Sequence, residues 1–235
     1  MGRTTDFHSH ILPGIDDGSA SLEESIQMLQ MAADQGVERI VATPHFYAKH
    51  DRPEKFLQKR AEAENLLRTE MKKYPGMPQL YVGAEVFFFN GISDSEVLPA
   101  LSIHNTGYVL VEMPMPPWSD RMYRELENIW LKQDLIPVIA HIDRYLGPWS
   151  ARKIPEKLEK LPVKVQANAS FFLEKSTRSA AFRMLRREQI HLLGSDCHNL
   201  TDRAPNLAAA VKVIGEKFGP DILSYFRYHE DEILK

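Results

Sequence analysis

The chain has 235 residues, of which 43% are hydrophobic and 26% are charged, enough apolar material for one barrel-sized domain. Its formal net charge of −3 at pH 7 argues against a nucleic-acid partner bound through a basic surface. Because the sequence has no signal peptide, no apolar run of about 20 residues and only one cysteine, we expect a cytoplasmic protein without membrane insertion or disulfides.

Seven short, mostly apolar segments alternate with segments of helical periodicity along the chain. A capping box of Ser21 and Glu24 begins the first predicted helix, which ends at Gly36. The predicted strands are Thr4–His8, Arg39–Thr43, Leu80–Val86, Tyr108–Glu112, Ile136–Ala140, Val163–Asn168 and Ile190–Ser195. The other predicted helices are Pro53–Lys73, Asp120–Gln133, Ala151–Leu161, Leu173–Glu188, Pro205–Phe218 and Pro220–Lys235.

Apolar runs without alternation indicate strands that are covered on both faces, and hence a parallel sheet. Seven strand–helix repeats predict an α/β fold, a distorted seven-stranded (β/α)7 barrel that is TIM-like but one strand short. A doubly wound open sheet is the alternative, although no Gly-x-Gly-x-x-Gly motif follows any predicted strand. No linker, repeat or low-complexity segment divides the chain, so we expect a single domain covering residues 1–235.

Histidines and carboxylates stand at the ends of six of the seven predicted strands. Catalytic groups of parallel barrels collect where strands end, so these side chains are expected to meet at one rim. His8 and His10 project to the same face because side chains alternate along an extended strand. With Asp17 from the first loop, the candidate metal ligands are His8, His10, Asp17, His45, Glu85, Glu112, His141, Asp196 and His198.

Four carboxylates packed together would raise one another's pKa, and divalent metal ions remove that cost. Nine ligands suit two or three ions, and a mixture of imidazole and carboxylate favours manganese, iron, zinc or cobalt over magnesium or calcium. Such a centre activates water and attracts a dianion. Arg144 and Arg203 follow His141 and His198 closely, and guanidinium groups bind phosphate in bidentate fashion.

The expected metal centre and the two neighbouring arginines predict a phosphomonoester hydrolase, in which Arg144 and Arg203 are the catalytic residues that hold the phosphoryl oxygens. The alternative for the two arginines is that they only neutralise the carboxylates. Asn168 ends the remaining strand and is expected to orient a neighbouring group, whereas Asp16 is expected to be a turn residue. Five aromatic residues near strand ends could stack on a phosphotyrosine ring, although ordinary loop packing is the better expectation for each: Phe46, Tyr47, Trp118, Tyr145 and Trp149.

Cys197 and Arg203 have the spacing of the Cys-x5-Arg loop of cysteine-dependent tyrosine phosphatases. The five residues between them contain no Gly to build a backbone cradle for phosphate, and they include the negative Asp202. Cys197 also alternates away from Asp196 and His198 on the strand. We therefore expect metal-dependent hydrolysis and no catalytic role for Cys197.

The motifs resemble the PHP (polymerase and histidinol phosphatase) superfamily. Its signature is present as His8-Ser9-His10, Thr43-Pro44-His45, Gly83-Ala84-Glu85, His141 and Asp196-Cys197-His198. The stretches Asp16-Asp17-Gly18, 140–145 and 195–199 narrow the resemblance to bacterial metal-dependent tyrosine phosphatases encoded with capsule and exopolysaccharide synthesis machinery. The similarity extends from about residue 5 to residue 230.

This resemblance implies a distorted seven-stranded barrel of the PHP type and a trinuclear, usually manganese-supported centre built from all nine ligands. It also implies phosphate binding by Arg144 and Arg203 and dephosphorylation of tyrosines on the tail of a bacterial tyrosine autokinase. Asp143 stands where the family often has Glu, which leaves a proton-donor role for this residue open. The alternatives are a small-molecule phosphatase, such as histidinol-phosphate phosphatase, and a catalytically silent metal-binding module.

Overall fold

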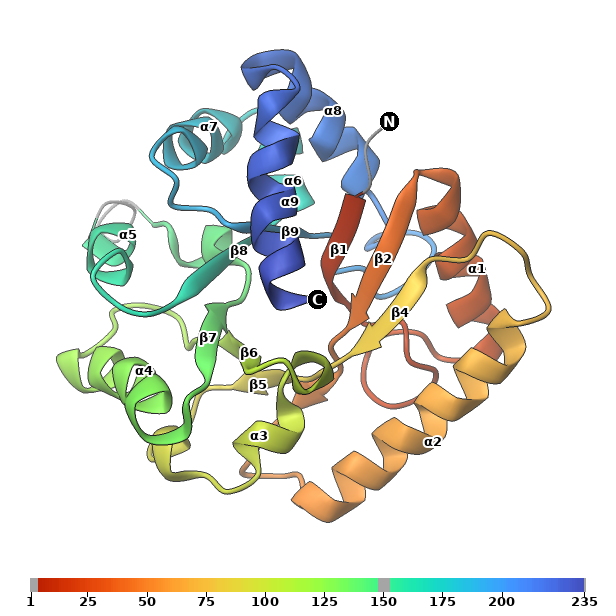
Figure 1. The fold of residues 1–235 in the computed structure, drawn as a ribbon, viewed down its shortest axis with the longest axis horizontal. Helices are drawn as coiled ribbons and strands as arrows, with labels where there is room; N and C mark the ends of the chain where they lie inside the picture. Colours follow the sequence, from red (N-terminus) through yellow and green to blue (C-terminus); the bar gives the residue numbers. More distant parts are fainter. Residues whose placement is uncertain (1–3, 148–152, 235) are drawn as a thin grey trace.

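The computed structural model describes residues 4–147 and 153–234, in which parallel strands alternate with helices. The strands curl around a common centre, and most helices lie outside them (Figure 1). The strands are β1 (Thr4–Ser9), β2 (Val37–Ala42), β3 (His45–Phe46), β4 (Gln79–Val82), β5 (Glu85–Phe87), β6 (Tyr108–Glu112), β7 (Ile136–Ile139), β8 (Lys164–Asn168) and β9 (Leu192–Gly194).

The longer helices cover the outer side of the curled sheet, and short helical turns fill several connections. The α-helices are α1 (Leu22–Asp34), α2 (Pro53–Met71), α3 (Leu98–Leu101), α4 (Asp120–Gln133), α5 (Lys153–Leu158), α6 (Ala169–Leu173), α7 (Arg178–Arg186), α8 (Leu207–Phe218) and α9 (Asp221–Ile233). The 3-10 turns are η1 (Ile92–Asp94), η2 (Ile103–Asn105) and η3 (Ile142–Tyr145). Within the described residues, no helix combines the length and apolar character needed to cross a membrane.

Several predicted elements have the expected bounds, because their local signals agree with their packing. β6 and α4 begin and end at the predicted residues. Ser21 caps α1 by accepting the Glu24 N–H at 3.2 Å, as predicted, while Glu24 accepts the N–H of Ala20 at 2.8 Å. The predicted helix start at Ala151, the helix end at Lys235 and the rim residue Trp149 lie outside the described residues.

Other predicted bounds are wrong, and each difference has a local cause. The strand predicted over 80–86 is divided into β4 and β5 at Gly83, where an added Cβ would lie 3.1 Å from Ile103 Cα. The helix predicted over 173–188 begins only at Arg178. The Arg178 guanidinium donates to the carbonyls of Phe172 and Leu173 at 2.8 and 2.5 Å, and thereby completes the end of α6.

The parallel strands form two sheets, ordered β1-β2-β4 and β3-β5-β6-β7-β8-β9. β1 also touches the end of β9: Asp196 N–H donates to His8 O at 2.8 Å, and His10 N–H donates to Cys197 O at 2.9 Å. The Asp6 carboxylate accepts the backbone N–H of Ser195 at 2.8 Å and its hydroxyl at 2.5 Å. Burial raises the pKa of Asp6 to about 6, against these hydrogen bonds. This is a curled parallel α/β sheet whose first and last strands are adjacent.

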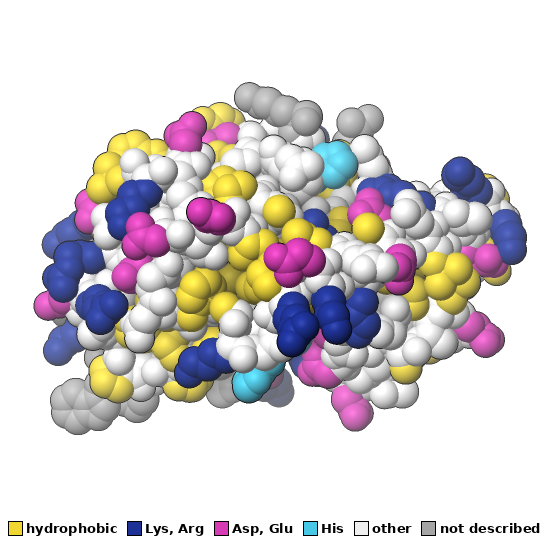
Figure 2. All heavy atoms as spheres, turned by 90° about the horizontal axis from the view of Figure 1, so that it is seen from below, with side chains coloured by type: hydrophobic (Ala, Val, Ile, Leu, Met, Phe, Trp, Pro, Cys, Tyr) yellow, Lys and Arg dark blue, Asp and Glu magenta, His cyan; other side chains and the backbone are white. Residues whose placement is uncertain are grey.

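α9 lies over the N-terminal ends of the strands, where Figure 1 draws it in dark blue in front of the sheet. Thr5 of β1 donates to Glu230 at 2.8 Å, and Tyr108 and Lys164 donate to Glu232 at 2.8 Å. The opposite end of the sheet, where the strands finish, is left for polar side chains. On the face that Figure 2 shows, acidic and basic side chains are interspersed around a central group of hydrophobic ones.

Gly194 allows β9 to lie close to β1, because a Cβ there would be 2.6 Å from His8 Cβ and 2.7 Å from Gln166 Nε2. We expect Gly194→Ala to lower the free energy of unfolding by about 1–3 kcal/mol through overpacking, measured by urea denaturation. Gly215→Ala in α8 is the matched control: its Cβ would meet no atom within 4 Å, so it should raise stability by about 0.5–1 kcal/mol. Equal effects of the two substitutions would contradict the close approach.

Candidate metal centre

The nine predicted ligands gather at the end of the sheet opposite α9, and each lies within 4.0 Å of at least one other ligand. They come from the ends of strands or from the loops that follow them. The parallel arrangement explains this gathering, because parallel strands all finish at the same edge.

Glu85 is at the middle of the cluster and is 1% exposed. Its Oε2 lies 3.1 Å from His8 Nε2, 3.2 Å from His10 Nε2 and 3.0 Å from His45 Nδ1. Its Oε1 lies 2.8 Å from His141 Nε2. Burial alone would raise the pKa of Glu85, but the surrounding imidazoles hold it well below its usual range. This carboxylate is therefore ionised.

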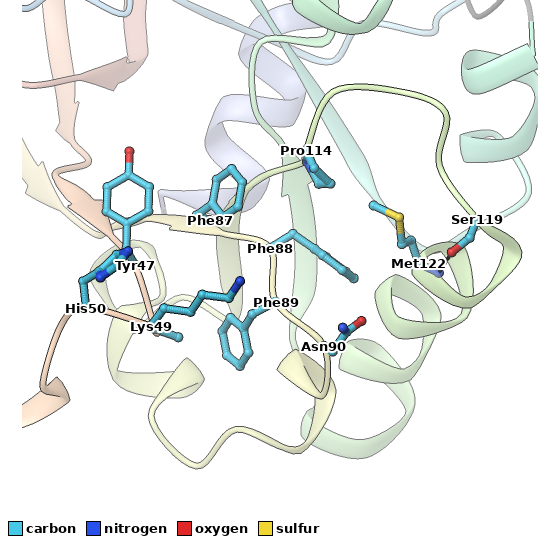
Figure 3. A pocket seen from close by; sticks show the side chains of 11 residues that line it. Tyr47, Lys49, His50, Phe87, Phe88, Phe89, Asn90, Pro114, Ser119 and Met122 are labelled. Atoms are coloured by element: carbon cyan, nitrogen blue, oxygen red, sulfur yellow. Dashed lines mark hydrogen bonds between the residues drawn. The ribbon is translucent and has the colours of Figure 1, made fainter.

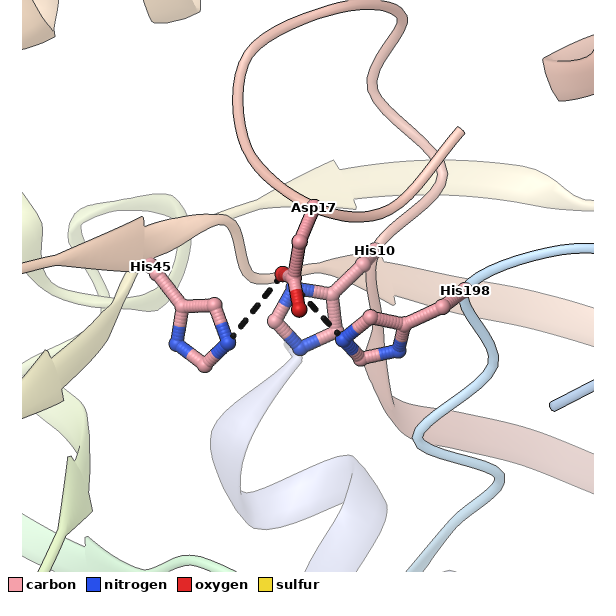
Figure 4. A group of neighbouring side chains, drawn as sticks. All are labelled: His10, Asp17, His45 and His198. Atoms are coloured by element: carbon pink, nitrogen blue, oxygen red, sulfur yellow. Dashed lines mark ion pairs between the residues drawn. The ribbon is translucent and has the colours of Figure 1, made fainter. Parts of the chain in front are cut away.

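Asp17 lies beside His10, His45 and His198, as Figure 4 shows, and its side chain is 64% exposed. One of its oxygens lies 3.5 Å from both His45 Nε2 and His198 Nε2. The His10 and His198 rings are 3.9 Å apart between centroids. Three groups of side chains have donor atoms close enough together to hold an ion: His10, Asp17, His45 and His198; His8, His10 and Glu85; and His45, Glu85 and Glu112.

The donor set fits divalent metal ions. In the described part of the chain, four buried ligand atoms have no hydrogen-bond partner: His45 Nδ1, Glu85 Oε2, His141 Nδ1 and His198 Nε2. Buried polar atoms seldom remain unpaired, and imidazole nitrogen with carboxylate oxygen is a combination that transition metals bind. These side chains thus form a candidate metal centre.

Arg144 and Arg203 both reach the edge of this centre and meet on one carboxylate. Arg144 Nη2 lies 2.5 Å from Asp196 Oδ2, and Arg203 Nη2 lies 2.9 Å from Asp196 Oδ1. Arg144 Nη1 is also 3.6 Å from Glu112 Oε1. Both guanidinium side chains remain almost two-fifths exposed, so they neutralise carboxylates and can still contact a ligand from solvent.

Asp16 lies in a turn, as expected, and its carboxylate also orients His10, which the sequence did not predict. Its Oδ1 accepts the Gly18 N–H at 3.0 Å, which is the turn contact. Its Oδ2 pairs with His10 Nδ1 at 2.7 Å and accepts the His45 N–H at 3.0 Å. Burial would raise the pKa of Asp16, but the pairing with His10 and the backbone N–H groups lower it to about 2. The ionised carboxylate places a proton on His10 Nδ1 and leaves Nε2 facing the cluster.

Two amides of β8 support the ligands from the inner side. Asn168 Nδ2 donates to Asp196 Oδ2 at 3.1 Å, which confirms that Asn168 orients a neighbouring group. Gln166, which the sequence analysis missed, accepts the His141 N–H at 2.6 Å and lies 3.2 Å from His8 Nδ1. Its position two residues before Asn168, on the same strand face, is the signal that could have identified it.

The backbone is unusual at two of the ligands. His141 and Asp196 have φ values of 31° and 55°, in the left-handed region that costs energy for a residue with a Cβ. Non-glycine residues in this region cluster at functional sites, where the surrounding structure holds them. Here the left-handed backbone turns both side chains into the cluster directly after β7 and β9.

Among the described aromatic residues expected near the rim, only Tyr47 is exposed, and Cys197 is buried. Phe46, Trp118 and Tyr145 are buried in the main apolar core, whereas Tyr47 is exposed at the rim, with its ring 5.3 Å from that of His45. Cys197 is fully buried, and burial raises the pKa of its thiol. Because the thiolate is the nucleophilic form, Cys197 is unsuited to catalysis, as expected.

Together, the curled parallel sheet and the buried cluster of histidines and carboxylates define an α/β protein with a candidate metal centre at the ends of its strands. Residues 4–234 match the family described as "Capsular polysaccharide synthesis, CpsB/CapC". The chain belongs to this family, as its sequence motifs indicated.

Relatives with curated names are tyrosine phosphatases. The chain is 31% identical over 229 residues to tyrosine-protein phosphatase CpsB of Streptococcus pneumoniae, covering 91% of this chain and 90% of the relative. It is 29% identical over 240 residues to tyrosine-protein phosphatase YwqE of Bacillus subtilis, with coverages of 97% and 90%. A crystal structure from work on these two metal-dependent tyrosine phosphatases matches with a TM-score of 0.87 at 25% identity, covering 98% of this chain and 94% of that one.

The contact between Asp16 and His10 leads to a prediction. Asp16→Asn should lower the affinity of the metal-stripped protein for a divalent metal such as Mn²⁺ by about 10- to 100-fold, because the amide no longer fixes the imidazole tautomer. Metal titration by calorimetry measures this change. Asp34→Asn removes an exposed carboxylate at the end of α1 and should leave the affinity unchanged. Equal affinities for the two variants would contradict the role of Asp16.

Proposed function

We propose that this protein is a metal-dependent phosphomonoester hydrolase that acts on phosphotyrosine in proteins. The observation that carries the proposal is the carboxylate of Glu85, buried among four histidines, with Arg144 and Arg203 at the edge of the cluster. Metal ions beside guanidinium groups suit a phosphoryl dianion. The tyrosine phosphatases among its curated relatives support the same activity.

The nine side chains are the metal ligands of this proposal, and they hold two or three ions, of which manganese is our first choice over iron, zinc and cobalt. The three groups of donor atoms support up to three ions, and Glu85, which belongs to two of the groups, has two carboxylate oxygens with which to bridge ions. His141, through Glu85 and Glu112, and Asp196, through His8 and His10, extend the cluster on its inner side.

The protein side chains divide the catalytic work. Bound divalent ions supply Lewis acidity and activate the attacking water. Arg144 and Arg203 hold the phosphoryl oxygens and stabilise their charge in the transition state. Phenolate, with a free pKa of about 10, is a fair leaving group, so a strong general acid is not required. Asp143 Oδ1 accepts the N–H of Asn168 at 2.9 Å and thereby orients the end of β8.

The protein substrate in this proposal is the phosphotyrosine-bearing tail of a bacterial tyrosine autokinase that regulates capsule and exopolysaccharide synthesis in the cytoplasm. The family description, capsular polysaccharide synthesis, supports this assignment. The chemistry of phosphotyrosine agrees with this proposed centre, because its phosphate is a dianion and its leaving group is an aryl oxide. Phosphoserine, whose alkoxide leaves less readily, should be a poorer substrate.

For the fold, the proposal is a closed, distorted seven-stranded barrel in one domain. β2 and β3 are separated only by Thr43 and Pro44, and β4 and β5 only by Gly83 and Ala84, so each pair counts as one interrupted strand of the barrel. The contacts of β1 with the end of β9 support closure. A main apolar core that contains Leu29 of α1 and Phe226 of α9 supports one domain.

The test compares substrates on metal-replete protein. We expect rapid hydrolysis of a phosphotyrosine peptide, slow hydrolysis of the matched phosphoserine peptide and of histidinol phosphate, and loss of activity with a chelator that Mn²⁺ restores. Equal or faster turnover of histidinol phosphate would overturn the substrate assignment, and chelator-insensitive activity would overturn the mechanism.

The double variant His8→Ala/His10→Ala should lose bound metal and activity while keeping its circular dichroism spectrum.

Cys197 provides a separate test of metal dependence. Cys197→Ser should retain most of the phosphatase activity, because the buried thiol touches no phosphoryl group in this mechanism. Asp196→Asn, one residue away, should lose activity by at least about 100-fold, since it removes a ligand and the charge between the two arginines. Steady-state kinetics on a phosphotyrosine peptide measures both. A loss of several orders of magnitude in the cysteine variant would refute metal-dependent hydrolysis.

A further inference from the structure

A groove of about 480 Å³ opens beside the metal centre. Its walls are the end of β5, the loops that follow β3, β5 and β6, and the first turn of α4, and Figure 3 shows their side chains surrounding one space. Its main lining residues are Tyr47, Lys49, Phe87, Phe89, Pro114 and Met122. The volume lies in the range of sites that hold a small organic ligand, or a few residues of a peptide. Neither the metal ligands nor the two arginines line it.

The groove adjoins the candidate metal centre at Tyr47 and Phe87. The Tyr47 ring lies 5.3 Å from that of His45 and 5.7 Å from that of Phe87, between centroids. Phe87 pairs in register with Glu112, and the next residue, Phe88, donates its N–H to Glu112 O at 2.8 Å. A phosphotyrosine whose phosphate reaches the metals therefore has the chain next to it at the mouth of this groove.

The chemistry of the walls points to the occupant. Phe87, Phe89 and Met122 offer apolar surface that a side chain of similar character would cover. Lys49 is exposed, and in Figure 3 its side chain reaches across the space between Tyr47 and Phe89. Within the described residues Lys49 forms no ion pair, and no carboxylate is among the residues that line the groove. A carboxylate in the groove would provide that partner.

We propose that this groove binds the segment flanking the phosphotyrosine, and that it selects a substrate with one acidic and one apolar side chain beside the phosphorylated residue. The acidic side chain pairs with Lys49, and the apolar side chain packs on Phe89 and Met122. The inference rests on the proposed phosphotyrosine activity and adds a sequence preference to it. The metal centre provides the chemistry, and the three loops provide recognition of the flanking chain.

The test measures kcat/KM for phosphotyrosine peptides with Glu and Leu beside the phosphotyrosine, and for peptides with Lys or Ala in place of the Glu. Para-nitrophenyl phosphate, which has no flanking chain, is the reference substrate. Lys49→Glu should lower the ratio of kcat/KM for the Glu peptide to that for the reference by about 5- to 10-fold, because attraction becomes repulsion. The same variant should now prefer the Lys peptide over the Glu peptide.

Phe89→Ala should lower the ratio of kcat/KM for the Leu-containing peptides to kcat/KM for para-nitrophenyl phosphate by about 10-fold, because apolar contact is lost. Lys212→Glu, an equal charge reversal at an exposed position on α8, should leave every ratio unchanged. Unchanged ratios in Lys49→Glu and Phe89→Ala, with normal hydrolysis of phosphotyrosine peptides, would overturn the groove and leave the proposed function intact. Failure of the wild-type protein on every phosphotyrosine peptide would instead overturn the function.

Discussion

A buried carboxylate surrounded by imidazoles is the constraint on which this structure depends. Glu85 lies within 3.2 Å of nitrogen atoms from four histidines, which come from β1, β3 and β7 or from the residues that directly follow these strands. A buried charge is costly unless its partners are held in place, and a curled parallel sheet provides such fixed positions. Asp16, Gln166 and Asn168 then hold the ligands in orientation. The same curled sheet therefore determines both the fold and the geometry of the candidate site.

Much of this arrangement could be predicted from the sequence, because the ligands occupy positions that physical rules define. Alternation along a strand places His8 and His10 on one face, and parallel strands bring Glu112 and His141 to the same edge. The helix bounds were predictable where the local signals were strong, as at Ser21 and across α4. These features require only neighbouring residues and the direction of the strands.

The remainder depends on contacts between segments that are distant in sequence. The pairing of Asp16 with His10, and of both arginines with Asp196, follows from loop shapes that no local pattern specifies. The division of the third strand depends on how closely Ile103 approaches Gly83. Likewise, Phe87 and Phe89 became candidates for substrate recognition only when the loops after β3 and β6 were seen to face them.

The contact between Asp6 and Ser195 joins residues 189 positions apart. On the ribosome, β1 emerges long before the strand end that completes its pairing exists, so one edge of β1, the strand of His8, stays open during that time. The complete cluster of nine side chains can form only after Asp196 and His198, which follow β9, have left the exit tunnel. Completion of the candidate metal centre is consequently a late step of biosynthesis.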